Sequence, residues 1–251
     1  MLGRSQSRDR TAVEGLADAS AAILAGGQGR RLRAVTGCMP KVLAEVRGRP
    51  FLKYLLEQLA AAGVKHVVLC TGYLGEQVQD TFGDLYCGLR LDYSQELSPL
   101  GTAGALRLAL PLFRSHSVLA MNGDSFCEAD LVAFWARHCE WDADATLLMT
   151  QAPDTRRYGH VRVDGDGHVL GFDEKNENGH PGWINAGVYA VKRDLLELVP
   201  PNAPVSLERQ MIPGWIARRL YGYQSAGRFL DIGTPEAYRE AQAFFAQGAA
   251  T

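Results

Sequence analysis

The sequence lacks any long hydrophobic run. Its apolar runs, such as residues 67–70, are far shorter than the roughly 20 residues that a membrane-spanning helix needs. Residues 1–15 carry arginines but no apolar stretch, so this segment does not resemble a secretory signal. These absences predict a cytoplasmic protein with no membrane partner, in which residues 1–18 form a polar tail.

An excess of charge of either sign is also missing. The 26 Lys and Arg residues nearly balance the 28 Asp and Glu residues, which leaves a formal net charge of −2. A protein that binds nucleic acid over its whole surface carries a strong positive excess, so no nucleic-acid partner is expected. Any binding of anions must therefore be local.

The five cysteines show no pairing pattern. Their number is odd, and the sequence has neither a C-x-x-C motif nor zinc-finger spacing. A disulfide framework and a zinc site are therefore not expected, and free thiols in a reducing compartment fit the pattern.

The sequence does hold enough apolar material for a sizeable core. Hydrophobic residues make up 47% of the 251 residues, which suits one α/β domain of ordinary size or two small ones. In the first half, short apolar runs alternate with amphipathic stripes, which predicts βαβ units. Residues 164–167 read Asp-Gly-Asp-Gly between two short strands, which predicts a hairpin. We therefore predict one domain over residues 19–251, with a doubly wound, mainly parallel sheet and an antiparallel addition.

The expected elements follow from periodicity and from start and stop signals. Pro50 precedes a helical stripe and Gly63 follows it. Thr102 and Asp130 are expected to cap two further helices. The expected helices are residues 51–62, 75–82, 102–110, 131–139 and 235–246, and the expected strands are residues 21–25, 64–70, 89–93, 118–121, 145–150, 161–163, 168–172 and 183–191.

A glycine-rich stretch follows the first expected strand. Residues 24–32 read Leu-Ala-Gly-Gly-Gln-Gly-Arg-Arg-Leu, which combines approachable backbone N–H groups with cations, as a polyphosphate cradle requires. It is not a Walker loop, and Leu32 stands where a dinucleotide fingerprint has its third glycine. An ordinary flexible turn with solvated arginines is the alternative. The residues of this cluster are Leu24, Ala25, Gly26, Gly27 and Gly29, with the cations Arg30, Arg31, Arg33 and Lys41.

Two aspartates are expected at the carboxyl ends of strands. Asp124 follows a buried run and a turn, and Asp231 ends another apolar run. Two such carboxylates suit Mg²⁺, which prefers one or two carboxylates together with phosphate oxygens and water. We expect them to meet at one edge of the sheet, and the alternative is that each merely forms a turn or a helix cap.

Seven motifs in a fixed order make the chain resemble the sugar-1-phosphate nucleotidyltransferases. They are LAGGQGRRL, PKVLAEVRGRPFL, PLGTAGAL, MNGD, GFDEK, INAGVY and FLDIGTPE, and they span about residues 21–246. One departure is that Val42 and the pair Ala44 and Glu45 replace the family's usual prolines, although Lys41 is retained. The resemblance implies a Rossmann-like, GT-A-type fold.

Within this family the chain most resembles the D-glycero-α-D-manno-heptose 1-phosphate guanylyltransferases. The text that carries this is VVLCTGYLGEQV, YSQELSPLGTAGAL, RYGHV and SLERQMIP. Those enzymes have the short single-domain form, so no carboxy-terminal β-helix is expected.

The resemblance also implies the reaction. An NTP, with GTP favoured, and a sugar 1-phosphate would give an NDP-sugar and pyrophosphate, with Mg²⁺ as the cofactor, and assembly into a homo-oligomer stays open. The residues that match the family's motifs are catalytic Arg31, Lys41, Asp124 and Lys175; metal-binding Asp124 and Asp231; nucleotide-binding Leu24, Ala25, Gly26, Gly27, Gly29, Arg30, Glu96, Gly101, Thr102 and Gly123; and sugar-binding Tyr158, Gly159, Glu174, Lys175 and Asn185.

Several alternatives remain at this point. Glu96 favours guanine, because a carboxylate only accepts hydrogen bonds and guanine offers two adjacent donors, but uridylyl-transferring relatives can also carry a glutamate here. Glu174 and Lys175 could be a solvated pair, and Tyr158 could serve only for packing. The rival functions are mannose 1-phosphate guanylyl transfer, N-acetylmuramate 1-phosphate uridylyl transfer and a non-catalytic nucleotide-sugar sensor; a dinucleotide oxidoreductase is disfavoured by Leu32.

Overall fold

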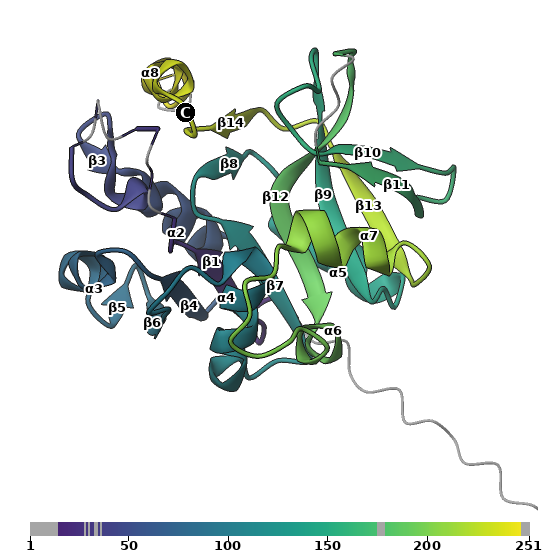
Figure 1. Cartoon of the computed structure of the whole chain (residues 1–251), viewed down its shortest axis with the longest axis horizontal. Coiled ribbons are helices and arrows are strands. Elements are labelled where there is room, and N and C mark those ends of the chain that lie inside the picture. The colour runs from purple at the N-terminus through teal and green to yellow at the C-terminus, as the bar shows by residue number, and fades with distance from the viewer. Residues whose placement is uncertain are drawn as a thin grey trace, which may run out of the picture.

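The computed structural model describes residues 15–27, 29, 31–32, 35, 37–174 and 179–246. Among these residues, ten strands form one sheet, with helices on both of its faces (Figure 1). The strands of this sheet are β1 (Ser20–Leu24), β4 (His66–Thr71), β5 (Leu85–Tyr86), β6 (Leu89–Gln95), β7 (Ser117–Asn122), β9 (Ala145–Ala152), β10 (His160–Val163), β11 (Val169–Asp173), β12 (Gly182–Lys192) and β13 (Leu220–Ser225).

Helices and short strands complete the architecture. The helices are α2 (Phe51–Ala61), α3 (Gly75–Phe82), α4 (Gly101–Ala109), α5 (Leu131–Glu140), α6 (Arg193–Glu197), α7 (Ile212–Trp215) and α8 (Pro235–Phe244), with the single turns η1 (Lys41–Leu43), η2 (Leu110–Leu112) and η3 (Leu207–Met211). Two small ribbons lie outside the central sheet: β2 (Glu45–Val46) with β3 (Arg49–Pro50), and β8 (Ser125–Cys127) with β14 (Phe229–Asp231).

The centre of the sheet is parallel, in the order β7-β1-β4-β6. Its register places Leu24 opposite both Asn122 and Cys70, so three strands end side by side. Beyond β7 the long strand β12 runs antiparallel and carries β9 and the β10–β11 hairpin. The expected doubly wound sheet with an antiparallel addition is confirmed, and so is the hairpin.

Alternate residues of the central strands supply two separate cores. Ile23 of β1 belongs to one core, with α2 and α5, while its neighbour Ala22 belongs to the other, with α4, α6 and α7. Side chains of a strand point alternately to its two faces, so a strand buried on both faces reads as a continuous apolar run. This explains why short runs rather than alternating patterns marked these strands in the sequence.

One expected helix cap is confirmed and the other is wrong. The Asp130 carboxylate accepts from the Ala133 N–H at 2.9 Å and begins α5 as predicted. In α4, however, Thr102 lies inside the helix, which begins at Gly101 and has no side-chain cap. The Ala103 N–H donates instead to the carbonyl of Val205, a contact that no local pattern predicts.

The position of β14 also differs from the expectation. It does not lie in the central sheet but pairs antiparallel with β8, which places Asp231 opposite Ser125. The Ile232 N–H then donates to the carbonyl of Asp124 at 2.9 Å. The two aspartates therefore meet through a separate ribbon rather than through neighbouring strands of one sheet.

Helix α8 packs on the β2–β3 hairpin near the start of the domain (Figure 1). The Tyr238 hydroxyl donates to the carbonyl of Glu45 at 2.5 Å, and Gln242 Oε1 accepts from the Arg47 N–H at 2.8 Å. Phe245 stacks on Tyr54 of α2, with ring centroids 3.8 Å apart. These contacts join the segment after Asp231 to the segment after Lys41.

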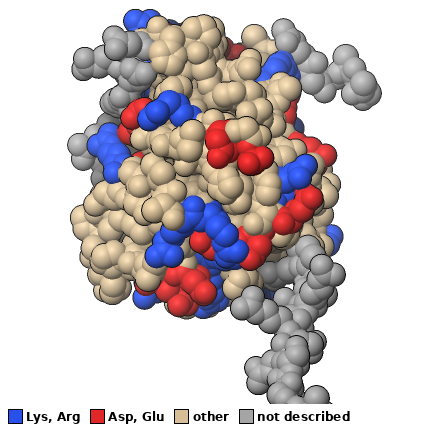
Figure 2. Space-filling view, turned by 90° about the vertical axis from the view of Figure 1, so that its right-hand side faces the viewer, with Lys and Arg blue, Asp and Glu red and all other residues tan. Residues whose placement is uncertain are grey.

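The molecular surface and the thiols agree with the composition. Acidic and basic side chains are intermixed over the face shown in Figure 2. The five cysteines are free. Among the described residues, no helix is long and apolar enough to cross a membrane.

Candidate active site

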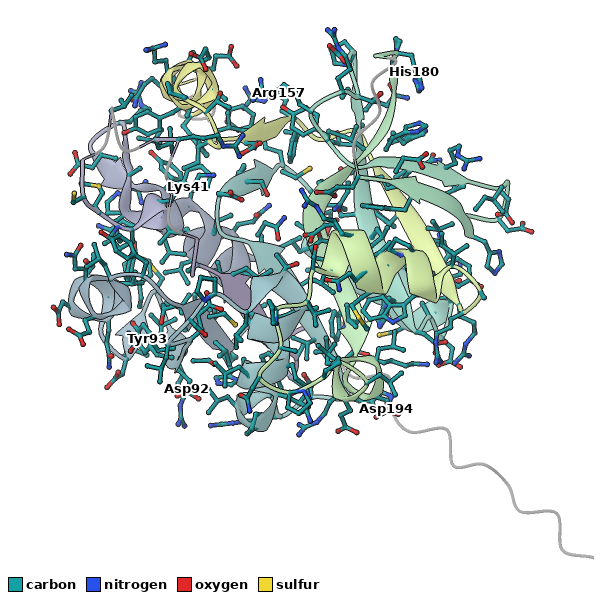
Figure 3. All side chains as sticks on the ribbon, viewed as in Figure 1. Lys41, Asp92, Tyr93, Arg157, His180 and Asp194 are labelled. Atoms are coloured by element: carbon teal, nitrogen blue, oxygen red, sulfur yellow. The ribbon has the colours of Figure 1, made fainter. Side chains whose placement is uncertain are left out.

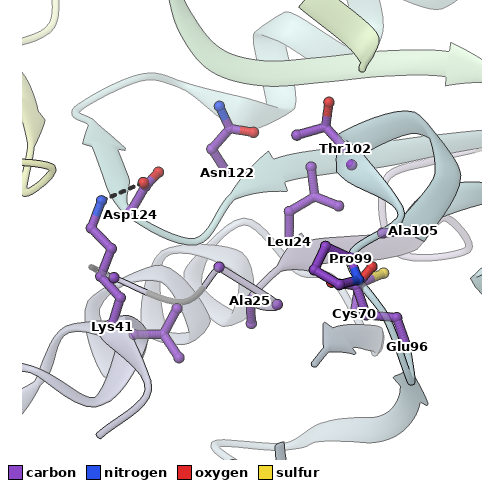
Figure 4. A pocket seen from close by; sticks show the side chains of 15 residues that line it. Leu24, Ala25, Lys41, Cys70, Glu96, Pro99, Thr102, Ala105, Asn122 and Asp124 are labelled. Carbon is purple, nitrogen blue, oxygen red and sulfur yellow. Dashed lines mark hydrogen bonds and ion pairs between the residues drawn. The ribbon is translucent and has the colours of Figure 1, made fainter. Parts of the chain in front are cut away.

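The glycine-rich loop after β1 forms one wall of a cavity of about 580 Å³ (Figure 4). Leu24, Ala25, Gly26, Gly27 and Gly29 all line it, as expected from the sequence. Gly29 has a φ of 56°, and a Cβ there would lie 3.1 Å from the Cβ of Lys41. The positive φ and the close approach both favour glycine.

Lys41 lies directly behind this loop. It begins η1, its side chain is only 10% exposed, and its Nζ lies 2.5 Å from Asp124 Oδ2. Arg31 is exposed, while Arg30 lies outside the described residues. Arg33 lies outside them too. Of the two expected cations that the structure describes, Lys41 and Arg31, it is Lys41 that lies against an acidic group of the cavity.

Asp124 and Asp231 meet at this end of the cavity. Burial and the charge of Asp124 raise the pKa of Asp231, and the charge of Lys41 opposes the rise. The Gly233 N–H donates to Asp231 Oδ1 at 2.6 Å and holds the carboxylate in place. Gly123, just before Asp124, must be small, because a Cβ there would lie 2.6 Å from the carbonyl oxygen of Leu24.

This donor set fits Mg²⁺. Burial and the Asp124 charge disfavour the ionised form of Asp231. Both carboxylates offer hard oxygen ligands, and a divalent cation between them would remove the repulsion. Among the described residues, no group of three or more His, Cys, Asp or Glu side chains could hold a metal ion. The remaining ligands would then be phosphate oxygens and water, as is usual for Mg²⁺.

Glu96 lies at the opposite end of the same cavity (Figure 4). Its Oε2 accepts from the Leu100 N–H at 2.8 Å, and a Cβ on Gly26 would lie 2.6 Å from its Oε1. Burial raises the pKa of Glu96, and the Leu100 N–H partly offsets the rise. Gly101 and Thr102 line the cavity beside it, so all three expected base-side residues come together.

The described residues expected at the sugar lie on β12, in the loop before β10 and directly after β11. The Asn185 N–H donates to the carbonyl of Gly159 at 2.8 Å. Tyr158 packs edge-on against Phe229 of β14, with centroids 5.4 Å apart. Glu174 Oε1 lies 3.8 Å from Arg209 Nε. Lys175 lies outside the described residues.

Sequence reasoning missed two residues at this site. Asn122 lines the cavity, and its buried Oδ1 has no hydrogen-bond partner among the described residues. Arg157 donates from Nη2 to Thr234 Oγ1 at 3.4 Å, and its charge is among those that oppose the rise in the Asp231 pKa (Figure 3). Asn122 lies within the motif MNGD and Arg157 within the motif RYGHV. Neither residue was predicted to have a role, because the expected ligands in these motifs are their neighbours.

This grouping of backbone N–H groups, cations and carboxylates around one cavity suits an enzyme of the nucleotidyl transferase class. The model of the nucleotidyl transferase family matches residues 20–248, and the chain belongs to that family.

Individual relatives narrow the comparison. The chain is 36% identical over 223 residues to the D-glycero-alpha-D-manno-heptose 1-phosphate guanylyltransferase of Aneurinibacillus thermoaerophilus, covering 88% of this chain and 96% of that one. It is also 36% identical over 234 residues to the mannose-1-phosphate guanylyltransferase of Mycobacterium tuberculosis, covering 92% of this chain and 65% of that one.

A solved structure supports the same family membership. The structure of HddC from Yersinia pseudotuberculosis complexed with GMP-PN matches with a TM-score of 0.80 at 32% sequence identity. The match covers 90% of this chain and 99% of that chain.

Proposed function

We propose that this protein transfers a guanylyl group from GTP to a sugar 1-phosphate, with D-glycero-α-D-manno-heptose 1-phosphate as the favoured acceptor. The observation that carries the proposal is that Lys41 and Asp124 line one end of a glycine-lined cavity, with Asp231 close enough for the charges of both to shift its pKa. A reaction between two phosphates needs a site that stabilises the negative charge of both groups.

In this reaction an oxygen of the sugar phosphate attacks the α-phosphorus of GTP. A new P–O bond forms, the bond to the β-phosphate oxygen breaks, and pyrophosphate leaves with the electron pair. No protein nucleophile is required, so catalysis consists of positioning and charge stabilisation.

The chain's cations would each hold one part of the substrates. The loop N–H groups from Gly26 to Gly29, with Arg30 and Arg31, would hold the β- and γ-phosphates. Lys41 would lie between nucleophile and α-phosphate, and Lys175 would hold the sugar's phosphate. Asp124 and Asp231 would bind Mg²⁺, which when bound supplies positive charge to the α-phosphate oxygens.

Glu96 would select the base. Its carboxylate can accept from the N1–H and N2–H groups of guanine together. The Leu100 N–H occupies one lone pair of Oε2 and fixes the direction of the carboxylate. The guanylyl-transferring relatives favour the same base.

The sugar would lie against β12 and the 158–159 turn. Gly159, Glu174 and Asn185 are the hydrogen-bonding positions, and Tyr158 borders the pocket. Mannose 1-phosphate is the second candidate acceptor, because the mycobacterial relative is as similar in identity as the heptose relative. We also propose that residues 19–251 form a single catalytic domain. The protein would act in the cytoplasm, where GTP is available, and size-exclusion measurements would show whether it self-associates.

The test is an assay of pyrophosphate release. Five NTPs are combined with a panel of sugar 1-phosphates, with Mg²⁺ and with EDTA in its place. The proposal expects GTP with heptose 1-phosphate to react fastest and EDTA to stop the reaction. A preference for UTP, or no turnover with any pair, would contradict it.

A further inference from the structure

The first turn of α4 is bound by a segment from much later in the chain. The N–H groups of Ala103 and Gly104 donate to the carbonyl of Val205 at 2.9 and 3.1 Å, and the Val205 N–H donates to the carbonyl of Leu100 at 2.8 Å. The approach is close, since a Cβ on Gly101 would lie 2.6 Å from the Val205 oxygen. This main-chain docking brings η3 against the nucleotide side of the cavity.

Glu208, in η3, accepts hydrogen bonds from three side-chain hydroxyl groups there. Its Oε2 accepts from Thr102 at 2.7 Å and from Ser206 at 2.9 Å. Its Oε1 accepts from the Tyr189 hydroxyl at 3.0 Å. An ionised carboxylate can only accept, so all three hydroxyl hydrogens point towards Glu208.

The orientation of the Tyr189 hydroxyl in turn fixes the orientation of the Asn185 side chain. Because the Tyr189 hydroxyl donates to Glu208, its oxygen accepts, and it does so from Asn185 Nδ2 at 2.8 Å. Asn185 Oδ1 in turn accepts from the Gly187 N–H at 3.1 Å. Tyr189 is 1% exposed, and burial and the charge of Glu208 raise its pKa well above the usual value, so the hydroxyl keeps its proton. The Asn185 amide therefore has one defined orientation.

The other arm of the network reaches the nucleotide cavity. Thr102 donates to Glu208 and accepts from the Leu207 N–H at 2.7 Å. Thr102 also lines the cavity, together with Asn122 and Asp124 (Figure 4). One carboxylate thus contacts a residue of the nucleotide side and, through Tyr189, a residue of the sugar side.

We propose that Glu208 is a positioning residue that couples the two halves of the active site. The proposal rests on the proposed function, which assigns Thr102 to the nucleotide and Asn185 to the sugar. Glu208 is not among the residues that line the cavity, so it acts through Thr102 and Tyr189. A hydrogen bond lost from a buried network weakens binding by about tenfold, which is a measurable effect on each arm.

The test measures the KM of each substrate separately, with GTP and D-glycero-α-D-manno-heptose 1-phosphate. Thr102→Val keeps the volume but removes the hydroxyl, and it should raise the KM of GTP about tenfold while the sugar KM changes less than about twofold. Tyr189→Phe should raise the sugar KM about tenfold and the KM of GTP by less, since Tyr189 also hydrogen-bonds Asn122 of the cavity. Glu208→Gln should raise both KM values, because an amide cannot accept from all three hydroxyls.

A double substitution tests whether Tyr189 and Glu208 act in series. Tyr189→Phe should raise the sugar KM less in a Glu208→Gln background than in the wild type, because one arm is already broken. Equal effects in the two backgrounds would mean that Tyr189 acts independently of Glu208 and would overturn the coupling.

Glu57→Gln is the matched control. The Glu57 carboxylate also accepts from a tyrosine hydroxyl, that of Tyr86 at 3.1 Å, and pairs with Arg49, but it lies outside the cavity. This variant should lower the melting temperature without changing either KM. If Glu208→Gln behaved in the same way, Glu208 would be merely structural and the proposal would be wrong.

A second measurement does not depend on turnover. In ¹⁵N-labelled protein, the Asn185 side-chain amide should exchange its hydrogens faster in Tyr189→Phe and Glu208→Gln than in the wild type. Unchanged exchange in both variants would overturn the positioning role. If the wild type turned over no sugar 1-phosphate while this exchange still changed, the proposed function would fail and the positioning network would stand.

Discussion

The two ends of the parallel strands carry polar clusters that differ in burial and in the balance of their charges. At the amino ends, Ser20 Oγ lies 3.2 Å from His66 Nδ1, and His66 Nε2 lies 2.8 Å from Asp92 Oδ2. At the carboxyl ends lie Lys41, Asp124 and Asp231. In Figure 3, Asp92 is labelled at the lower edge of the molecule and Lys41 well above it, in the upper half.

The amino-end cluster has the residue types of a hydrolase triad but not its accessibility. Ser20 is 1% exposed, and its hydroxyl oxygen also accepts from the Arg114 N–H at 2.9 Å. A nucleophile must be reachable by substrate and free to give up its proton. This cluster therefore joins strand ends and stabilises the fold.

The contrast appears in two aspartates. Burial pushes the pKa of Asp92 up, but the hydrogen bond and charge of His66, with Arg90, outweigh it, so the pKa is lowered. Burial and Asp124 together raise the pKa of Asp231. Asp92 has its partners within the chain, whereas the positive charge near Asp231 does not offset burial and the charge of Asp124, so a bound cation would stabilise its ionised form. Unbalanced charge thus marks the functional end of the sheet.

The largest expected effect comes from removing a carboxylate of the functional end. Asp231→Asn and Asp124→Asn should each lower kcat/KM by about a hundredfold to a thousandfold, because each removes charge stabilisation at the reacting phosphate. The double variant should be little worse than either single one, since the two act as a unit. Steady-state pyrophosphate release checks this.

Melting in EDTA supplies the control for these variants. Asp231→Asn should melt no lower than the wild type, because it removes a charge that burial and Asp124 disfavour. A large loss of stability together with near-normal activity would reverse our assignment of this end of the sheet.

Arg31→Ala should have the next largest effect. It removes a cation from the phosphate loop, and we expect kcat/KM to fall by about 10- to 100-fold. Because Arg31 is exposed, the melting temperature should change little. Activity within about twofold of the wild type would remove Arg31 from the phosphate cradle.

Glu96→Gln should change selectivity more than rate. An amide cannot accept two hydrogen bonds from guanine's adjacent donors as a carboxylate does, so the preference for GTP over UTP should fall by about 1–3 kcal/mol. Competition between the two nucleotides in one assay measures this directly. An unchanged GTP/UTP ratio would place Glu96 outside the base pocket.

Asp92→Asn should have the smallest effect on catalysis. We expect a loss of about 1 kcal/mol of folding stability and unchanged KM values. The pKa of Asp92 is lowered in the folded state, so its contribution is full above the usual carboxyl pKa and disappears as the pH falls through the lowered value. Melting temperatures of both proteins across this acidic range test the sign; a gap that widened in acid would contradict it.

Local sequence patterns predicted most of the helices and strands but few of the contacts between segments that are distant in the sequence. The run at residues 21–25, the glycines after it and the hairpin at 164–167 were each visible in a few consecutive residues. The cap of α4 was not, because Val205 supplies it from far along the chain. For the same reason β14 was expected in the central sheet, although its partner is β8.

The candidate site shows the same division. Motif residues such as Gly29, Lys41 and Asp124 came together as expected around one cavity. Glu208 lies in the motif SLERQMIP, but the sequence does not predict a role for it, because its contacts with Thr102 and Tyr189 depend on how η3 packs against α4. Spacing along a sequence predicts local features such as the 164–167 turn and the Asp130 cap, but it carries no information on such long-range contacts.

The packing of α8 on the β2–β3 hairpin has a consequence for how the protein is made. Lys41 leaves the ribosome well before Asp231 of β14, and before Tyr238 and Gln242 of α8, which contact the hairpin. During synthesis the nucleotide loop therefore exists long before its second carboxylate does. A nascent chain cannot assemble the complete acidic pair, and its chemistry begins only after the late segment has been released and has closed over the early one.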